Sequence, residues 1–410
     1  MALRMLPSTM SSQMFPRLLS FSPAAGQWSR FLQSSSVLTQ TLFRPVGLSL
    51  TIPDLLSDIW DSVLRAVPKK KVSHMKRRHR QMAGKALKDV KNLNTCSGCG
   101  QSKQYLSWGS ADNAHPIDIF SLAVTDKQIL SASGASSIQV HSTTDLDFPL
   151  AQTIEGAHKV GCHHLVTDGR GSRAISVGFG GEIQIWVCRD GTWSKDDAGP
   201  GIADSGEVWA VALSENGQFL AGVSQDGHIK VWDLNASGEQ IQDYETKGSF
   251  GTCLDMSADG RLIASGHENG SVYIFSTETG RMPFSLSGLV KPVRTVAFSP
   301  AGKLLAAAGD SKVIVLFDTS SGEQVANLSG HSAWILSLAW STTGEYLLSG
   351  SFDGKVKVWS IDTKTCVATH SETEKAVWSV KWLPKVGRSE GFATAGANRS
   401  IAFYREATGG

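Results

Sequence analysis

Long apolar runs are absent from this chain of 410 residues, and cysteines are few. No stretch of about 18 or more apolar residues occurs, because proline and polar residues interrupt every candidate, which argues against a spanning helix. The six cysteines are Cys96, Cys99, Cys162, Cys188, Cys253 and Cys366. The last four stand singly in apolar, strand-like segments, where thiols usually serve as small core residues. This usage fits a reducing compartment and no membrane partner.

Motifs of the common enzyme classes are also missing. The chain has no Gly-Lys-Ser/Thr phosphate loop, no Gly-x-Ser-x-Gly elbow and no His-Glu-x-x-His pair. The run Cys162-His163-His164 could suggest a metal or a nucleophile, but strand alternation places His163 opposite Cys162 and His164. No third ligand lies nearby in the sequence. We therefore expect a binding scaffold that is not an enzyme and takes no small-molecule substrate.

Acidic residues do not occur between Met1 and Pro53, where Arg4, Arg17, Arg30 and Arg44 are spaced among serines and apolar residues. An Arg-rich, Ser-rich and acid-poor start is typical of a mitochondrial transit peptide. Residues 1–65 are predicted to be such a segment, which predicts a mitochondrial location for this end of the chain. An ordinary disordered tail is the alternative.

The charge of the chain is divided unevenly between its two parts. Residues 1–91 hold 15 Lys/Arg against 4 Asp/Glu, and residues 92–410 hold 24 against 33. Self-repulsion keeps so basic a segment extended until phosphates neutralise it, which favours RNA as its partner. A solvated linker or a nuclear-localisation run is the alternative. The candidate RNA-binding residues are Lys69, Lys70, Lys71, Lys76, Arg77, Arg78 and Arg80.

Three short motifs in residues 66–101 sharpen this interpretation. They are Ala66-Val-Pro-Lys-Lys-Lys-Val-Ser73, His74-Met-Lys-Arg-Arg-His-Arg80 and Asn92-Leu-Asn-Thr-Cys-Ser-Gly-Cys-Gly100. Together they resemble the mitochondrial form of the L-thirty-two family of large-subunit ribosomal proteins. The resemblance implies a mature start near Ala-Val-Pro-Lys, an arm bound to ribosomal RNA, and two Cys-x-x-Cys pairs that hold one zinc ion.

The second half of that zinc ribbon is missing. Cys96 and Cys99 form one Cys-x-x-Cys pair, but the next cysteine is Cys162 and no second pair follows. A closed structural zinc site needs four ligands. We therefore expect this half site to be empty unless a second ligand pair is supplied elsewhere, and no cofactor is predicted.

A repeat of 42 to 46 residues runs through the rest of the chain. Aromatic residues end an apolar strand at Trp186, Trp232, Phe275, Phe317, Trp359 and Tyr404, and a degenerate first unit ends at Val140-His141. A period of about 40 to 45 residues with four short strands is typical of WD-repeat propeller blades. Residues 102–410 are predicted to form an all-β, seven-bladed WD-repeat β-propeller, preceded by a largely disordered basic N-terminal segment.

The sixth unit holds the most complete set of WD-repeat residues. We predict a buried hydrogen-bond network of His331, Ser349, Asp353 and Trp359, with a structural role. An open propeller would leave an unpaired strand edge. The segment Gln104-Tyr-Leu-Ser-Trp-Gly109 is therefore predicted to complete the last blade as its outer strand.

One rim of the ring is the candidate binding surface. Counting back eight residues from the hairpin glycines, and matching the first, second and last units by eye, gives Phe120, His163, Trp209, Thr252, Arg294, Leu336 and Trp378. Aromatic residues and arginine are enriched at interface hot spots. The predicted partner-binding residues are Phe120, Trp209, Arg294, Trp334 and Trp378. The alternative is that these rings only cover strand ends.

A second resemblance covers residues 102–410. It is carried by Ser102-Lys-Gln-Tyr-Leu106, Ala114-His-Pro-Ile-Asp-Ile-Phe-Ser-Leu122, Ile129-Leu-Ser-Ala-Ser-Gly134 and Thr394-Ala-Gly-Ala-Asn-Arg-Ser-Ile-Ala-Phe-Tyr-Arg-Glu-Ala407. The segment resembles the fungal WD-repeat subunit of the superkiller complex, whose relatives also act in meiotic recombination. The resemblance implies a helical-repeat scaffold protein and an RNA helicase as partners, in exosome-dependent mRNA decay in the cytoplasm, with a nuclear, meiotic role in relatives.

The leading hypothesis is therefore an adaptor propeller fused to the front half of a mitochondrial ribosomal protein, by alternative splicing or by a merged gene. The ribosomal motif stops in mid ribbon and the propeller starts without a linker, which motivates this interpretation. The alternative is a structural component of the mitochondrial large ribosomal subunit that carries a propeller.

Overall fold

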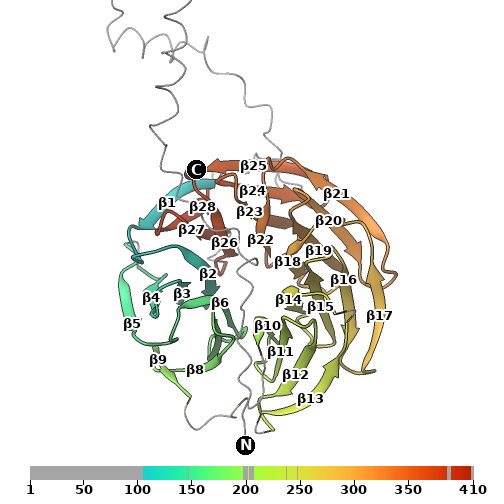
Figure 1. Cartoon of the computed structure of the whole chain (residues 1–410). Coiled ribbons are helices and arrows are strands. Elements are labelled where there is room, and N and C mark those ends of the chain that lie inside the picture. The colour runs from blue at the N-terminus through green and yellow to red at the C-terminus, as the bar shows by residue number, and fades with distance from the viewer. Residues whose placement is uncertain are drawn as a thin grey trace, which may run out of the picture. The chain divides into compact units, whose positions relative to one another are not determined.

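A computed structural model describes residues 105–407, except 146, 197–201, 203–206, 237, 247 and 386–388. The predictions for the transit segment, the RNA-binding arm, Cys96 and Cys99 fall outside these residues. Within them, 28 strands form seven four-stranded antiparallel sheets, and no helix occurs (Figure 1). The sheets are arranged around a ring as seven blades, so the predicted seven-bladed all-β propeller is confirmed. No helix in the described part of the chain could span a membrane.

Each blade runs in chain order from the innermost strand to the outermost strand. Blade 1 contains β2 (Ile119–Val124), β3 (Gln128–Ser133), β4 (Ile138–Ser142) and β5 (Leu150–Ile154). Blade 2 contains β6 (Cys162–Thr167), β7 (Arg173–Gly178), β8 (Ile183–Arg189) and β9 (Thr192–Lys195). Blade 3 contains β10 (Val208–Leu213), β11 (Phe219–Ser224), β12 (Ile229–Asp233) and β13 (Glu239–Tyr244).

The remaining blades follow the same order, with one exception at the end. Blade 4 contains β14 (Gly251–Met256), β15 (Leu262–His267), β16 (Val272–Ser276) and β17 (Arg281–Leu286). Blade 5 contains β18 (Val293–Phe298), β19 (Leu304–Gly309), β20 (Val313–Asp318) and β21 (Gln324–Ser329). Blade 6 contains β22 (Ile335–Trp340), β23 (Tyr346–Ser351), β24 (Lys355–Ser360) and β25 (Thr365–Ser371). Blade 7 contains β26 (Val377–Trp382), β27 (Gly391–Gly396), β28 (Ile401–Glu406) and β1 (Tyr105–Ala111).

The first two strands of blades 3 to 6 are joined by the glycine turns that the sequence indicated. Gly217, Gly260 and Gly302 have φ angles of 72°, 72° and 68° in these turns. Residues with a Cβ atom rarely adopt this left-handed conformation, which explains the glycines. The hydroxyl groups of Ser257 and Ser299 accept the amide hydrogens that begin the second strands of blades 4 and 5, at 2.9 and 3.0 Å.

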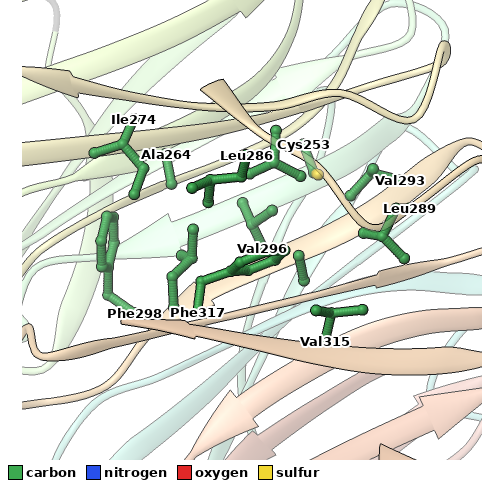
Figure 2. Packing of buried hydrophobic residues seen from close by; sticks show 13 residues of the cluster. Cys253, Ala264, Ile274, Leu286, Leu289, Val293, Val296, Phe298, Val315 and Phe317 are labelled. Atoms are coloured by element: carbon green, nitrogen blue, oxygen red, sulfur yellow. The ribbon is translucent and has the colours of Figure 1, made fainter. Parts of the chain in front are cut away.

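The hydrophobic core lies between neighbouring blades. Figure 2 shows the layer between blades 4 and 5, where Ile274 and Leu286 of one blade meet Val296, Phe298 and Phe317 of the next. All five side chains are at most 7% exposed. Burying a side chain of this size contributes about 1.5 to 3 kcal/mol relative to exposure. Each blade therefore depends on both neighbours for its stability.

A ring of hydrogen bonds links the innermost strands. In five blades, a polar side chain of the innermost strand accepts the amide hydrogen of a buried aliphatic residue in the next blade, over 3.0 to 3.4 Å. The acceptors are Ser121, His164, Thr295, Ser337 and Ser379. Blades 3 and 4 have Ala210 and Cys253 at this position, and the register of their bulges is the same.

Strand β1 closes the ring. It pairs with β28, from Tyr105 opposite Glu406 to Ala111 opposite Ile401, and so becomes the outer strand of blade 7. The predicted role of this segment is confirmed. Tyr105 is 4% exposed, and its ring lies 6.0 Å from Trp382 and 5.3 Å from Phe392. The strand before the first blade therefore belongs to the core of the last one.

The hydrogen-bond ring predicts that Ala210→Ser stabilises the propeller. The new hydroxyl would take the position of Ser121 and accept the amide hydrogen of Leu254, the residue equivalent to Leu165. One added buried hydrogen bond should raise the free energy of unfolding by about 0.5 to 1.5 kcal/mol, measured by denaturant unfolding. Ala221→Ser is the control, because Ala221 belongs to the same apolar cluster but lies on the second strand of blade 3. Equal destabilisation by both variants would refute the proposed ring.

Candidate partner-binding face

Every innermost strand has a β-bulge at its second residue. The seven bulged residues are Phe120, His163, Trp209, Thr252, Arg294, Leu336 and Trp378. They are the same seven that the sequence placed at one rim, so their structural equivalence is confirmed. A bulge re-aims its side chain at the end of a strand. These residues form the rim ring, on the face where the innermost strands begin.

Aromatic rings connect this rim across four blades. Trp378 lies 5.3 Å from Phe120, Phe120 lies 5.5 Å from Phe179, and Phe179 lies 5.0 Å from His163. His163 is 4.3 Å from Trp209, whose ring is 5.5 Å from Phe250. We call the set the aromatic belt, which consists of Phe120, His163, Phe179, Trp209, Phe250, Trp334, Phe352 and Trp378.

The belt continues over blades 6 and 5. The ring of Phe352 lies 6.5 Å from Trp378 and 5.7 Å from Trp334. Phe352 is 44% exposed and Trp334 is 37% exposed. Arg294 stacks over Trp334 at 5.4 Å, and Asp310 holds its guanidinium through bonds of 2.8 and 3.1 Å. Arg294 thus already has an acidic partner within the chain and helps to fix Trp334.

Three members of the belt were not found from the sequence. Phe179 and Phe352 lie in the turns between the second and third strands of blades 2 and 6, and Phe250 precedes β14. A signal exists for the first two, since each stands seven residues before the strand-end tryptophan, Trp186 or Trp359. Their repeat position faces the rim, which counting along the innermost strands alone could not reveal.

The rim tryptophans are held in place but not covered. Phe120, Trp209 and Trp378 are partly buried, and the indole nitrogen of Trp378 donates to Asp118 at 3.3 Å. Neighbouring rings pack against both sides of Phe120, at 5.3 and 5.5 Å. Aromatic side chains that are fixed before binding lose little conformational entropy when a partner docks. The belt is therefore a preorganised apolar surface.

Charge around the belt is unequal. Among the described residues, the loops and turns of blades 2 to 4 on this face carry seven acidic residues and one basic residue (155–161, 179–182, 196, 202, 207, 225–228, 245, 246, 248–250 and 268–271). The corresponding segments of blades 5 to 7 carry four of each (287–292, 310–312, 330–334, 352–354, 372–376 and 397–400). Aromatic faces and carboxylates both attract cations.

The Cys162-His163-His164 run is structural, but not with the alternation expected from the sequence. The bulge at His163 shifts the register, so Cys162 packs among blade 1 residues while His164 accepts the Val211 amide of blade 3. Burial raises the pKa of the Cys162 thiol to about 12 and lowers the pKa of His164 to about 3. Among residues 105–407 with their gaps, no group of three or more His, Cys, Asp or Glu could hold a metal ion.

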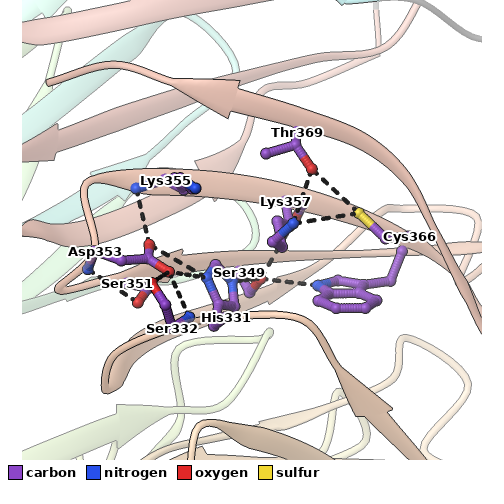
Figure 3. A network of polar contacts seen from close by, with 10 residues as sticks. His331, Ser332, Ser349, Ser351, Asp353, Lys355, Lys357, Cys366 and Thr369 are labelled. Atoms are coloured by element: carbon purple, nitrogen blue, oxygen red, sulfur yellow. Dashed lines mark hydrogen bonds and ion pairs between the residues drawn. The ribbon is translucent and has the colours of Figure 1, made fainter. Parts of the chain in front are cut away.

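The network predicted in blade 6 is present (Figure 3). The Ser349 hydroxyl lies 2.8 Å from His331 Nε2 and accepts the indole N–H of Trp359 at 2.8 Å. His331 Nδ1 lies 3.1 Å from the Asp353 carboxylate, which also accepts the Ser332 amide at 2.9 Å. Burial lowers the pKa of His331, and the charge of Asp353 opposes this shift.

Other blades vary this network. Blade 2 repeats it with His158, Ser176, Trp186 and Glu182, and blade 7 joins Glu372 to Thr394. Blade 5 replaces it by apolar packing of Leu289, Ala307 and Phe317. Hydrogen bonding and apolar packing are therefore alternative ways to fix the same part of a blade.

Blade 1 keeps the histidine but lacks the acid. His115 Nε2 lies 2.8 Å from the Ser131 hydroxyl, while its Nδ1 has no hydrogen-bond partner among the described residues. The register places Ala135 at the position of Asp353, and His141 at the position of Trp359. Burial lowers the pKa of His115 to about 4, and His141 adds to this shift.

The family comparisons divide the chain into two parts. The family described as the Echinoderm microtubule-associated protein second beta-propeller matches residues 208–403, and the ribosomal L32p protein family matches residues 66–105. The meiotic recombination protein rec14 of Schizosaccharomyces pombe is 45% identical over 305 residues, which cover 74% of this chain and 98% of rec14.

The ribosomal relatives match only a short part of this chain. The large ribosomal subunit protein bL32m of Neurospora crassa is 66% identical over 59 residues, which are 14% of this chain and 46% of that protein. The bL32m protein of S. pombe is 53% identical over 69 residues, 17% of this chain and 66% of that protein. The chain therefore spans less than two thirds of these ribosomal relatives. Both resemblances, to a meiotic recombination WD protein and to a mitochondrial ribosomal protein, are confirmed.

The blade 6 network predicts that Asp353→Ala destabilises the propeller. The substitution removes the carboxylate from His331, Ser332 and the Lys355 amide. Leaving buried polar groups without partners should lower the free energy of unfolding by about 2 to 3 kcal/mol. Asp362→Ala, at an exposed position, is the control for thermal and denaturant unfolding. A loss no greater than that of the control would contradict the structural role.

The missing acid of blade 1 predicts that Ala135→Asp protects the protein from acid. His115 is neutral when folded, so its stabilising contribution is present above pH 6.5 and is lost as pH falls from 6.5 to about 4. An aspartate at position 135 would stabilise the imidazolium and reduce this loss by about 1 kcal/mol near pH 5. Urea unfolding from about pH 7.5 to about pH 4.5 measures the effect. Ala135→Asn is the uncharged control, and identical pH profiles for Asp and Asn would refute the assignment.

Proposed function

Because this chain belongs, through its propeller, to the WD-repeat family of the meiotic recombination protein rec14, we propose that it is a non-catalytic adaptor whose aromatic belt holds a partner protein. The belt is the observation that carries this proposal. Eight ring-bearing side chains are in contact on one face, and two of them are at least 37% exposed. Partly exposed, packed aromatic residues are the residue types that dominate protein interfaces.

The chemistry of this face favours a partner segment that combines an apolar anchor with positive charge. Glu182 and Glu207 each lie within three residues of a belt aromatic, Phe179 or Trp209. A lysine or arginine beside an apolar residue could contact ring faces and carboxylates at once. Such a segment would be recognised over blades 2 to 4, where the acidic residues outnumber the basic ones.

We propose the superkiller complex as the assembly that this adaptor serves. The basis is the resemblance carried by residues 102–410, and especially by the ending Thr394–Ala407. The partners would be a helical-repeat scaffold protein and an RNA helicase, in mRNA decay in the cytoplasm. The similarity to rec14 adds a proposed nuclear role with meiotic recombination proteins.

A second candidate function concerns the N-terminal part. The match of residues 66–105 to the ribosomal L32p family supports an arm that binds ribosomal RNA in the mitochondrial large subunit. The candidate residues stay Lys69, Lys70, Lys71, Lys76, Arg77, Arg78 and Arg80. The matched segment ends at Tyr105, which lies in the core of blade 7 as the first residue of β1. The residues at which a second zinc-binding pair would follow are therefore part of the propeller.

Strand β1 begins on the face opposite the belt. β26 starts at the rim, and three antiparallel pairings in succession make β1 run toward the rim from the opposite face. Tyr105 therefore lies at the face opposite Trp378.

The proposal predicts that Trp209→Ala and Trp378→Ala each weaken partner capture at least tenfold while the propeller stays folded. Affinity purification of the tagged chain, with quantification of the co-purified helicase and scaffold protein, measures the loss. Leu106→Ala and Leu150→Ala are controls, because these side chains are 59% and 52% exposed on outer strands. Unchanged capture by both tryptophan variants would refute the belt as the binding surface.

The identity of the captured proteins separates the two candidate functions. Recovery of an RNA helicase and exosome cofactors supports the adaptor, and recovery of mitochondrial large-subunit proteins in their place contradicts it. The arm variant with Lys69, Lys70 and Lys71 changed to Ala should lose only the ribosomal set.

The fusion predicts a tryptic peptide that spans the boundary between the two parts of the chain. Trypsin should release Asn92–Lys103, which runs from the Cys-x-x-Cys pair to the start of the propeller. If the chain is made and imported as one protein, mass spectrometry of mitochondria should detect this peptide. Its absence, together with abundant Thr295–Lys303 in the cytosol, would indicate two separate proteins and leave the adaptor proposal standing.

A further inference from the structure

An ionisable pair occupies a position that is otherwise small and apolar in the innermost strands. Three residues after each bulge, five blades have alanine or valine, whereas blade 4 has Asp255 and blade 7 has Lys381. The apolar set is Ala123, Val166, Ala212, Ala297 and Ala339. Neither ionisable residue belongs to the rim ring or to the polar networks described above.

Asp255 makes the inter-blade bond that its own blade otherwise lacks. Cys253 stands where five blades have a polar acceptor, and the bond to blade 5 is made instead by Asp255, whose carboxylate accepts the Phe298 amide hydrogen at 2.7 Å. On the rim side of the same two strands, the Thr252 hydroxyl donates to the carbonyl oxygen of Val293. The junction of β14 and β18 is therefore held by the Asp255 carboxylate, by the Thr252 hydroxyl and by the apolar layer between the two blades.

The charged groups around this carboxylate are few. Burial raises the pKa of Asp255 to about 6, while the Phe298 amide and the charge of Lys381 act in the opposite direction. Burial lowers the pKa of Lys381, and Asp255 opposes that shift. His164 of β6 also feels the charge of Lys381 and is neutral, since burial lowers its pKa to about 3. Arg294 acts on the neighbouring Cys253, but its guanidinium is paired with Asp310.

We propose that Asp255, through its bond to the Phe298 amide, forms a proton-controlled joint that sets how firmly blade 4 is held to blade 5. When Asp255 is protonated, its side chain can still accept the Phe298 amide hydrogen, and no charge has to be partly buried at the junction. With Asp255 ionised, the charge is compensated by one amide hydrogen and by Lys381 across the ring. Because Arg294 and Thr252 lie on the same two strands, the joint supports the rim over these blades.

The direction of the effect follows from linkage. The pKa of Asp255 in the folded protein, about 6, lies above its ordinary value of 3.8, so the folded state favours the protonated form. The stabilising contribution is therefore fully present below about pH 3.8 and is lost as pH rises through about 6. Between about pH 5 and about pH 7.5 the ratio of folded to unfolded protein should fall by at most about tenfold through this group.

Four forms of the full chain test the joint: the wild type, Asp255→Asn, Lys381→Met and Asp126→Asn. Asparagine keeps the oxygen that accepts the Phe298 amide but does not titrate, and Asp126 is an exposed control. Urea unfolding and hydrogen exchange of β14 and β18 amides are measured from about pH 5 to about pH 7.5. All four forms contain the same histidines, so the effect of histidine titration on the free energy of unfolding cancels when the forms are compared.

As pH rises, we expect the ratio of folded to unfolded protein to fall by up to about tenfold in the wild type and in Asp126→Asn, relative to Asp255→Asn. Hydrogen exchange of the Phe298 amide should become faster in the same two forms. Lys381→Met should shift the midpoint of this difference to higher pH, since it removes the compensating charge. A pH profile of Asp255→Asn that matches the wild type would overturn the proposal. So would an unchanged midpoint in Lys381→Met, a test that holds even if Asp255→Asn folds poorly.

Discussion

Closure of the ring by β1 is the constraint on which the rest of the structure depends. A sheet that ends in an unpaired strand edge is open to association with other chains, and a ring of blades is stable only when its last sheet is complete. The bonds between β1 and β28 join the two ends of the propeller, and Tyr105 fills the core beside Trp382 and Phe392. The layers between blades, the hydrogen-bond ring and the rim all require that closure.

The polar networks and the aromatic belt are parts of one arrangement. Phe352 is followed directly by Asp353, and Phe179 stands three residues before Glu182. These two turns are therefore the ones that hydrogen bonds fix, from His331 to Asp353 in blade 6 and from His158 to Glu182 in blade 2. Blade 5 has apolar packing in place of a network, and there Asp310 holds Arg294 and, through it, Trp334. Each blade thus positions its part of the face by its own means.

Much of this structure could be predicted from the sequence because propeller repeats have a fixed length. The period of the strand-end aromatics gave the number of blades. Counting from the hairpin glycines gave four of the bulged residues, and matching the first, second and last units gave the other three. The same counting could not show the bulge itself, which reverses the expected side of Cys162 relative to His164. The pairing of Arg294 with Asp310 and the contribution of Phe179, Phe250 and Phe352 depend on contacts between separate loops, which periodicity does not encode. The role of Asp255 appears only when neighbouring blades are placed side by side.

The most direct test of this account compares residues 102–410 with residues 112–410, a chain that lacks β1. We expect 102–410 to unfold in one transition at the same midpoint as the propeller of the full chain. Loss of β1 should lower that midpoint by roughly 5 to 10 °C or more, and hydrogen exchange in β26, β27 and β28 should accelerate. If 112–410 unfolds at the same temperature and keeps the same protection in these strands, closure by β1 is not the constraint proposed here.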